Sequence, residues 1–313
     1  MAEKKESEAL PIPETSLEDA AGAETVFPLV LGRALTLDDL YPITAQEFSR
    51  FFAIIGDTGS GKTTLITSIY HLFLDGKAPT PFLFAGSETL LALEDRAFYL
   101  RVASYRSDAN MERTQRGVEE SILHLRLRNR ETKQMLNLLF SDLQGEDFDD
   151  VTADVDAAKE TFSSLFTAAR YIVVLLDGEK LLTGPSRFSA TQKAAHLLRT
   201  LRDAGLLSER SRILLTISKF DLIRAKNDSS LIKKIDRIPD IIVSQIPDLA
   251  GCLGFFHLAA MPTVATAEVP VGYNVSELLN ALLEPPQPPT VQREIPPMYS
   301  QCNLWKDRSI CQV

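Results

Sequence analysis

The sequence has few cysteines, few histidines and no long run of apolar residues. Its three cysteines, Cys252, Cys302 and Cys311, match neither a zinc-site spacing nor a disulfide framework, so we expect free thiols in a reducing compartment. The four histidines are scattered among apolar neighbours, which favours packing roles. No segment approaches the ~20 apolar residues of a membrane span, and the opening stretch MAEKKESEALPIPETSLEDA lacks the apolar core of a signal peptide. These absences favour a cytoplasmic protein.

Basic residues are in the minority. The sequence has 33 Lys and Arg against 42 Asp and Glu, a net charge of −9. This balance argues against nonspecific binding to nucleic acid or to an anionic membrane. With 45% hydrophobic and 24% charged residues, the composition is that of a globular protein able to bury a sizeable core.

Three regions differ in composition. Residues 1–25 are acidic, contain several prolines and predict a disordered N-terminal arm. Residues 284–313 form a Pro-rich C-terminal tail that cannot hold a helix, and this tail is either a plain extended segment or a peptide ligand for a partner. The folded domain is predicted to span residues 26–283.

The most informative stretch is IIGDTGSGKTT at residues 54–64, which fits the phosphate-loop (Walker A) pattern G-x-x-x-x-G-K-[ST]. The preceding run FFAII is typical of a buried parallel strand. The following TTLITSIYHLF places Leu65, Ile69 and Leu72 on one face of a helix. Strand, glycine-rich loop and helix is the order that a phosphate-binding loop requires.

Each residue type in this loop has a chemical reason to be there. Glycine permits positive φ and close approach, so that successive backbone N–H groups can turn toward an anion. Lys62 can reach the β- and γ-phosphates, and the Thr63 hydroxyl can join a Mg²⁺ shell. The loop therefore predicts a bound nucleoside triphosphate with Mg²⁺. The predicted binding residues are Gly56, Asp57, Thr58, Gly59, Ser60, Gly61, Lys62, Thr63 and Thr64.

Apolar runs alternate with helical segments along the rest of the domain. SILHLRLRN and QMLNLLFSD, joined by RETK, predict a hairpin. ARYIVVLLD, SRILLTIS and CLGFFHLAA follow, with helices expected at 188–204 and 231–247. This order predicts a three-layer α/β fold with a mainly parallel sheet, one antiparallel edge strand and helices on both faces. Functional residues of such sheets lie beyond the carboxyl ends of the strands.

Two strand ends carry candidate site residues. QMLNLLF ends in SDLQG, where Asp142 can hold Mg²⁺ and Gly145 can offer its N–H to a γ-phosphate. SRILLTIS ends in SKFD, where the Asp221 carboxylate can accept from both adjacent donors of guanine and the Lys219 stem can lie over the base. Thr114, in the polar loop RTQRG, could reach Mg²⁺ and the γ-phosphate, although such a threonine also fits an ordinary surface loop.

The motifs GDTGSGKT, DLQG and SKFD, in this order, resemble those of the GTPase branch of the P-loop nucleoside triphosphatases, the translation-factor and Ras-like class. The resemblance covers about residues 50–283 and implies a molecular switch that binds GTP/GDP and Mg²⁺. It assigns Thr114 to the first switch and Asp142 with Gly145 to the second. It also implies that Lys219 and Asp221 read guanine and that the backbone at Ala260, in LAAM, contacts the base.

An insertion of helical character, PFLFAGSETLLALEDRAFYLRVAS, lies at about residues 78–112. Within the class it looks most like the double-GTPase type predicted for bacterial conflict or signalling systems. The chain departs from the usual motifs at Ser218, where Asn or Thr is common, and at Ala259 to Met261, where Ser-Ala-Lys is common. Glu146 stands where a water-orienting Gln often sits, and its charge opposes that of the γ-phosphate.

The main interpretation is a regulatory GTPase whose loops around 105–117 and 142–155 become ordered with the γ-phosphate. The expected catalytic residues are Lys62, Thr114, Gly145 and Glu146. The sequence places no arginine at the site, although Arg113 and Arg116 flank the candidate switch. We therefore expect slow hydrolysis and a protein effector or activator. An ATP-using P-loop enzyme and a nucleotide-binding scaffold stay open, and the sequence does not predict the oligomeric state.

Overall fold

The computed structural model describes residues 32–103, 122–142, 169–207, 211–263 and 265–284, together with six single positions between 155 and 166. The side chains of residues 99–103 are not described. The predicted N-terminal arm and, beyond residue 284, the Pro-rich tail lie outside these residues. So do three predicted site residues, Thr114, Gly145 and Glu146.

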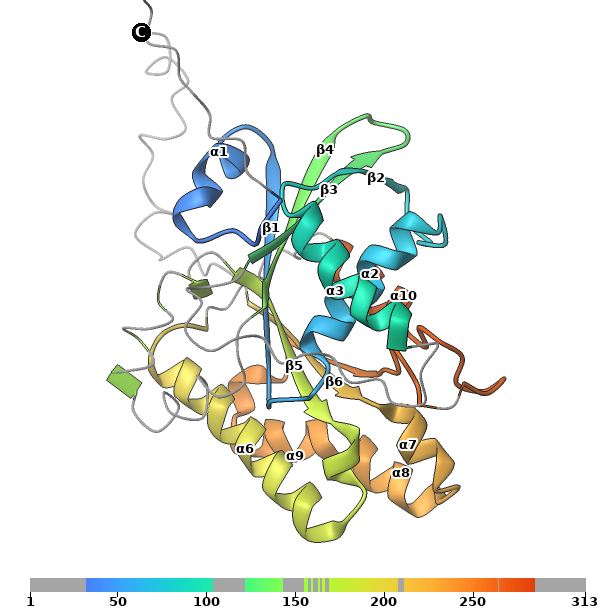
Figure 1. Ribbon diagram of the computed structural model, residues 1–313. Helices are drawn as coiled ribbons and strands as arrows, with labels where there is room; N and C mark the ends of the chain where they lie inside the picture. The colour runs from blue at the N-terminus through green and yellow to red at the C-terminus, as the bar shows by residue number, and fades with distance from the viewer. Residues whose placement is uncertain are drawn as a thin grey trace, which may run out of the picture. The chain divides into compact units, whose positions relative to one another are not determined.

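A seven-stranded sheet forms the centre of the fold, in the order β2-β3-β4-β1-β5-β6-β7 (Figure 1). The strands are β1 (Phe48–Gly56), β2 (Phe82–Gly86), β3 (Ile122–Asn129), β4 (Met135–Asp142), β5 (Ala169–Asp177), β6 (Arg212–Ser218) and β7 (Leu253–His257). All neighbouring pairs from β4 to β7 are parallel, whereas β3 runs antiparallel to both β4 and β2. The predicted α/β fold is therefore confirmed, with the antiparallel strand β3 next to the edge strand β2.

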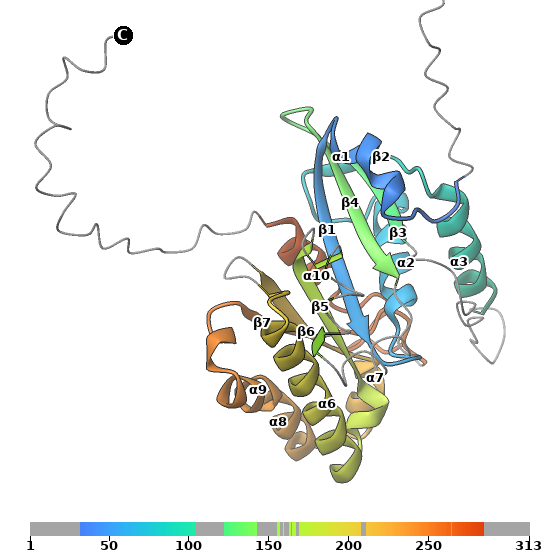
Figure 2. The same ribbon diagram turned by 90° about the vertical axis from the view of Figure 1, so that its left-hand side faces the viewer.

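Helices cover both faces of the sheet (Figures 1 and 2). One face carries α2 (Lys62–Leu74), α3 (Leu90–Ala103) and α10 (Val275–Leu283), and the other carries α6 (Gly184–Asp203), α8 (Ser229–Asp236) and α9 (Ile238–Gln245). The shorter elements are η1 (Asp38–Leu40), α1 (Tyr41–Thr44), η2 (Gly178–Leu181), α7 (Phe220–Ala225) and η3 (Pro247–Leu249).

The central strand β1 explains this three-layer arrangement. Phe51, Ala53 and Ile55 belong to the core cluster that includes α6, α8 and α9. Phe52 and Ile54 belong to the cluster that includes α2, α3 and α10. Successive side chains of a strand point to opposite faces, so a strand covered on both faces must be apolar at every position. The continuous run FFAII meets this requirement.

Two segments differ from the sequence prediction. The insertion is helical only in its second part, because Phe82–Gly86 forms the edge strand β2 before α3 begins. The helix expected at 231–247 is two helices, α8 and α9, which meet at Arg237. Pro239 lies in the first turn of α9, where its missing N–H costs no hydrogen bond, whereas a continuous helix would lose one there.

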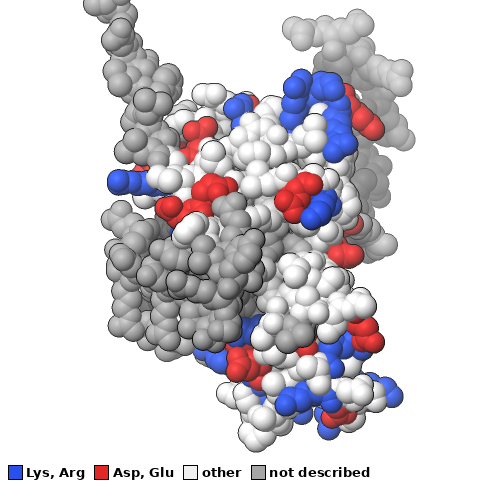
Figure 3. Space-filling model, turned by 45° about the vertical axis from the view of Figure 1, so that its right-hand side comes forward, with Lys and Arg blue, Asp and Glu red and all other residues white. Residues whose placement is uncertain are grey.

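Charged residues of both signs occur on the surface. In the view of Figure 3, basic and acidic side chains are interspersed, and a group of basic side chains lies at the upper end. A partner that meets this face therefore meets both signs of charge. Among the helices of the described residues, none is long and apolar enough to cross a membrane.

Candidate functional site

The carboxyl ends of four neighbouring strands bring the candidate residues together. In sheet order, β4 ends at Asp142, β1 at Gly56, β5 at Asp177 and β6 at Ser218. Asp177 and Ser218 are direct partners in the register of β5 and β6. Parallel strands present their carboxyl ends at the same edge of a sheet, which is where α/β proteins bind ligands.

The phosphate loop turns between β1 and α2 through two glycines in the left-handed region. The φ angles are 75° at Gly59 and 94° at Gly61. No atom among the described residues lies within 4 Å of a Cβ built at either glycine, so the space beside the loop is open. Helix α2 begins at Lys62, directly after the loop. An open loop at a helix N-terminus has the backbone donors and the dipole that an anion requires.

Lys62 is held against the carbonyl groups of its own loop. Its Nζ donates to Gly56 O at 2.7 Å and to Asp57 O at 3.1 Å. The Ser60 N–H donates to Asp57 O at 3.1 Å, and the Ser60 residue is fully buried. These bonds fix the turn and keep the lysine ammonium at the phosphate loop. Of the remaining predicted residues, Thr58 is exposed and Thr64 is partly buried in the first turn of α2.

Asp57 contributes a carboxylate to this loop, and two lysines balance its charge. Lys180 in η2 donates to Asp57 Oδ2 at 2.7 Å, and Lys193 in α6 donates to Oδ1. Burial by itself would raise the pKa of the Asp57 carboxyl, but the hydrogen bonds from the two lysines outweigh it and the pKa is lowered. The carboxylate thus ties the phosphate loop to η2 and α6. The sequence motif gave no indication of either lysine.

A hydroxyl and a carboxylate meet beside the phosphate loop. Thr63 Oγ1 donates to Asp142 Oδ1 at 2.9 Å, and the Asp142 side chain is only 2% exposed. Mg²⁺ prefers such oxygen ligands and usually takes one or two carboxylates together with phosphate oxygens and water. The described part of the chain holds no group of three or more His, Cys, Asp and Glu side chains, as a full protein cage would require. The donor set therefore fits Mg²⁺ bound jointly with a nucleotide.

A further residue at this carboxylate was not predicted. Arg96, in α3, donates from Nε to Asp142 Oδ2 at 3.1 Å and from Nη1 to Ala92 O at 3.0 Å. Nothing in the sequence singles out this arginine, because no motif includes it and 46 residues separate it from Asp142. Its position depends on the path of the inserted helix.

The SKFD motif forms a second group of polar contacts, after β6. Asp221 is 7% exposed, and its Oδ2 accepts from the Thr263 N–H at 2.9 Å. Lys219 has a φ of 48°, and its Nζ lies 2.9 Å from Asp177 Oδ2 and 3.4 Å from Glu179 Oε2. The carboxylate and the ammonium are thus both held in place. Sequence reasoning did not find Thr263 or Asp177.

The tips of β5 and β6 approach each other closely at Gly178. A Cβ at this position would lie 2.2 Å from Ser218 O, so only glycine fits. The Ser218 hydroxyl donates to Leu176 O at 3.3 Å and so bonds to β5, not to the phosphate loop.

The segment after β7 contains Ala260, whose backbone was predicted to contact the base. The carbonyl of Ala260 accepts from the Gly272 N–H at 3.0 Å, which holds this segment in place.

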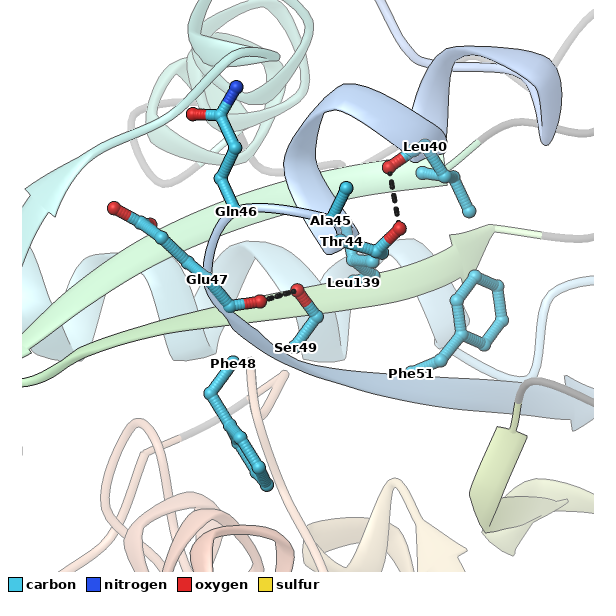
Figure 4. A pocket seen from close by; sticks show the side chains of 9 residues that line it. All are labelled: Leu40, Thr44, Ala45, Gln46, Glu47, Phe48, Ser49, Phe51 and Leu139. Carbon is cyan, nitrogen blue, oxygen red and sulfur yellow. Dashed lines mark hydrogen bonds between the residues drawn. The ribbon is translucent and has the colours of Figure 1, made fainter.

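A cavity of about 400 Å³ lies at the opposite, amino end of β1 (Figure 4). It is lined by Leu40, Thr44, Ala45, Gln46, Glu47, Phe48, Ser49, Phe51 and Leu139. The hydroxyls of Thr44 and Ser49 already donate to the carbonyls of Leu40 and Glu47, at 3.0 and 3.1 Å. Phe48 is 73% exposed and points away from the other side chains in Figure 4. No predicted site residue lines this cavity, so it is separate from the phosphate loop.

Comparison with solved structures finds a GTPase-like domain and a translation elongation factor. The GTPase-like domain of S. cerevisiae Ski7, bound to GTP, is 14% identical with a TM-score of 0.42, and the match covers 78% of this chain and 52% of that one. Translation elongation factor SelB from Methanococcus maripaludis, in complex with the GTP analogue GppNHp, is also 14% identical, with a TM-score of 0.36 and coverage of 78% and 36%. The chain thus spans about half of the first protein and about a third of the second. No curated protein matches the chain.

A protein-family model also matches most of the chain. The family model named Double-GTPase 2 matches residues 50–283, which is more than half of the chain. The matched region includes the phosphate loop, the contact between Thr63 and Asp142, and the SKFD motif with its Asp221. The likeness to the double-GTPase type that the inserted segment suggested is therefore confirmed, and the chain belongs to the Double-GTPase 2 family of P-loop GTPases.

Proposed function

We propose that this protein binds GTP and GDP with Mg²⁺ and hydrolyses GTP slowly, as a cytoplasmic molecular switch in a bacterial signalling or conflict system. The observation that carries the proposal is the 2.9 Å contact between Thr63 and Asp142 directly beside the open phosphate loop. Membership of the Double-GTPase 2 family supports GTP binding.

The phosphate loop and the start of α2 would hold the triphosphate. Backbone N–H groups of the loop would face the phosphate oxygens, and Lys62 would exchange its carbonyl partners, Gly56 and Asp57, for the β- and γ-phosphates. Thr63 and Asp142 would hold Mg²⁺, which when bound would neutralise negative charge that develops on the phosphate oxygens during phosphoryl transfer.

The SKFD motif would select guanine. Oδ2 of Asp221 is oriented by the Thr263 N–H, while Oδ1 takes part in no hydrogen bond among the residues that the structure describes. A carboxylate fixed in this way can accept from both N1–H and the amino group of guanine, whereas adenine offers an acceptor at N1. Lys219, held at its ammonium by Asp177, would place its stem along the base. The backbone at Ala260 would contact the base from the other side.

Hydrolysis would depend on residues outside the described part of the chain. Thr114 and Gly145 would contact the γ-phosphate, and Glu146 would stand near the attacking water, where its negative charge is unfavourable. A missing transition-state arginine slows this class of enzyme by about 10³ to 10⁵, and a partner protein can supply it. We therefore infer a slow switch that a protein effector or activator reads or accelerates.

Single-turnover hydrolysis of GTP by the purified protein tests the proposed function. We expect a rate on the order of 10⁻³ s⁻¹ or less, with Lys62→Ala as the control that removes binding. A rate near 1 s⁻¹ would contradict the slow switch. If Arg113→Ala or Arg116→Ala abolished such a fast rate, the arginine would belong to this chain. Hydrolysis of ATP in preference to GTP would favour the alternative of an ATP-using enzyme, and binding without any turnover would favour a scaffold.

A further inference from the structure

The Asp142 carboxylate has a partner at each of its oxygens. Thr63 Oγ1 donates to Oδ1 at 2.9 Å, and Arg96 Nε donates to Oδ2 at 3.1 Å. The side chains of Asp142 and Arg96 are 2% and 19% exposed, so this ion pair is largely shielded from water. Solvent screens the Coulomb attraction within such a pair less than on the surface, although the desolvation of both charges offsets part of the gain. Arg96 thus places a hydrogen-bonded cation on the predicted metal carboxylate.

Helix α3 fixes the position of this arginine. Leu93 and Ala97 are fully buried in the core cluster shared with α2, and the Tyr70 hydroxyl of α2 donates to Glu94 Oε1. Arg96 therefore comes from a helix that is packed against the domain. Its guanidinium is also bonded to the carbonyl of Ala92 in the same helix. Through Arg96, the inserted segment therefore contacts the carboxyl edge of the sheet at Asp142.

The guanidinium and a magnesium ion would require the same carboxylate. Mg²⁺ keeps a strict octahedral shell at ~2.0–2.1 Å and binds through oxygen ligands or their water molecules. A guanidinium bonded to Oδ2 places a positive charge within a few ångströms of that shell, and two cations in a shielded site repel each other strongly. Metal binding at Asp142 is therefore opposed for as long as Arg96 stays on the carboxylate.

We propose that Arg96 competes with Mg²⁺ for Asp142 and thereby sets the Mg²⁺ concentration at which this protein takes up nucleotide. Loading of Mg²⁺ with GTP displaces the guanidinium from Oδ2, which couples occupancy of the metal site to the inserted helix α3. The inference rests on the proposed function, since it concerns the metal that accompanies GTP. It gives the insertion a regulatory role in the same site.

A Mg²⁺ titration of fluorescent GTP binding tests this competition. The wild-type protein is compared with Arg96→Gln, which removes the charge, with Arg96→Lys, which keeps it, and with Arg202→Gln. Arg202→Gln is the matched control, because it removes the same charge from α6. Arg202 pairs with Asp203 and with Asp248. The loss of one charged hydrogen bond predicts that Arg96→Gln needs about tenfold less Mg²⁺ for half-saturation. Arg96→Lys should lie between this variant and the wild type, and Arg202→Gln should match the wild type.

A thermal-unfolding cycle without nucleotide and with chelator tests the ion pair itself. If Arg96 and Asp142 interact, the shift in Tm of Arg96→Gln combined with Asp142→Asn is smaller than the sum of the two single shifts. Additive shifts, or an Mg²⁺ requirement that Arg96→Gln leaves unchanged or raises, would overturn the inference while GTP binding stands. Failure of the wild-type protein to bind GTP at any Mg²⁺ concentration would overturn the proposed function and this inference together.

Discussion

At the scale of single residues, each carboxylate of the site is held by a partner of its own. Asp57 is paired with two lysines, Asp142 with a threonine and an arginine, and Asp221 with a backbone N–H. Burying a carboxylate is costly unless it is hydrogen-bonded or paired. These contacts therefore decide where negative charge sits around the predicted triphosphate, and substitutions at them should change specificity before they change the fold.

The first prediction concerns base selection by Asp221. In Asp221→Asn, the amide oxygen can keep the hydrogen bond from the Thr263 N–H, so the NH₂ group faces the base. A donor then opposes the guanine donors, and GTP affinity should fall by about 1.5–3 kcal/mol, roughly 10- to 100-fold. Xanthosine triphosphate has a carbonyl in place of the amino group, and its affinity should rise. Equilibrium binding of both nucleotides checks this, and an unchanged ratio of affinities would contradict the guanine assignment.

The buried histidine at the hairpin gives a second prediction. His124 in β3 is 1% exposed, its Nδ1 accepts from the Glu88 N–H at 3.0 Å, and its Nε2 lies 3.0 Å from Asn137 Oδ1. An accepting Nδ1 requires the neutral ring with its proton on Nε2. Burial lowers the pKa of His124, and the hydrogen bond with Asn137 and the negative charges of Glu88 and Glu47 offset this only in part.

The free energy of unfolding should therefore depend on pH through this residue. The unfolded chain takes up a proton near pH 6.5, before the folded protein does. Neutral His124 contributes to the free energy of unfolding above about pH 6.5. This contribution is lost as the pH falls toward the pKa of His124 in the folded protein, by up to about 1.4 kcal/mol per pH unit. Urea unfolding at pH 7.5 and 5.5 checks this. His124→Gln keeps one acceptor and one donor and should show a smaller loss, whereas the exposed His196→Gln should behave like the wild type. Equal losses in wild type and His124→Gln would refute the assignment.

At the scale of elements, local signals in the sequence predicted some boundaries and not others. The break between α8 and α9 has a signal, Pro239, which a prediction of one continuous helix over 231–247 overlooked. Strand β2 has only a weak signal, because Phe82–Gly86 is half-exposed and runs directly into residues of helical spacing. Whether such a run becomes an edge strand depends on pairing with β3, which is a tertiary contact.

The third prediction concerns the close approach of β5 and β6. In Gly178→Ala, the new Cβ would lie 2.2 Å from Ser218 O and 2.9 Å from Lys219 O, so the two strand tips must separate. We expect a loss of about 1–3 kcal/mol in the free energy of unfolding and weaker discrimination of GTP from ATP. Gly251→Ala is the matched control, because nothing lies within 4 Å of its Cβ. Urea unfolding measures the effect, and equal stability of the two variants would show that the strands can adjust.

At the scale of the whole molecule, the sheet order explains why motifs far apart in the sequence form one site. The strand ends at Asp142, Gly56, Asp177 and Ser218 are neighbours because β4, β1, β5 and β6 are adjacent. Motif order and strand-like runs were enough to predict this fold and to place Gly56, Asp142 and Ser218 at strand ends, but they did not single out Asp177. The partners Arg96, Lys180, Lys193 and Thr263 were not predictable, since each reaches the site from an element whose path carries no local signal.

The measurement that tests the account most directly is competition between GTP and ATP for the phosphate loop. Fluorescent GTP bound to the purified protein with Mg²⁺ is displaced by either nucleotide, in the wild type and in Lys62→Ala. If Asp221 recognises the guanine donors and Lys62 the phosphates, as proposed, GTP should displace the probe at a concentration at least about tenfold below that of ATP. Lys62→Ala, shown to be folded, should bind neither nucleotide tightly. Equal displacement by ATP, or full affinity in Lys62→Ala, would contradict a guanine-nucleotide site at the carboxyl edge of this sheet.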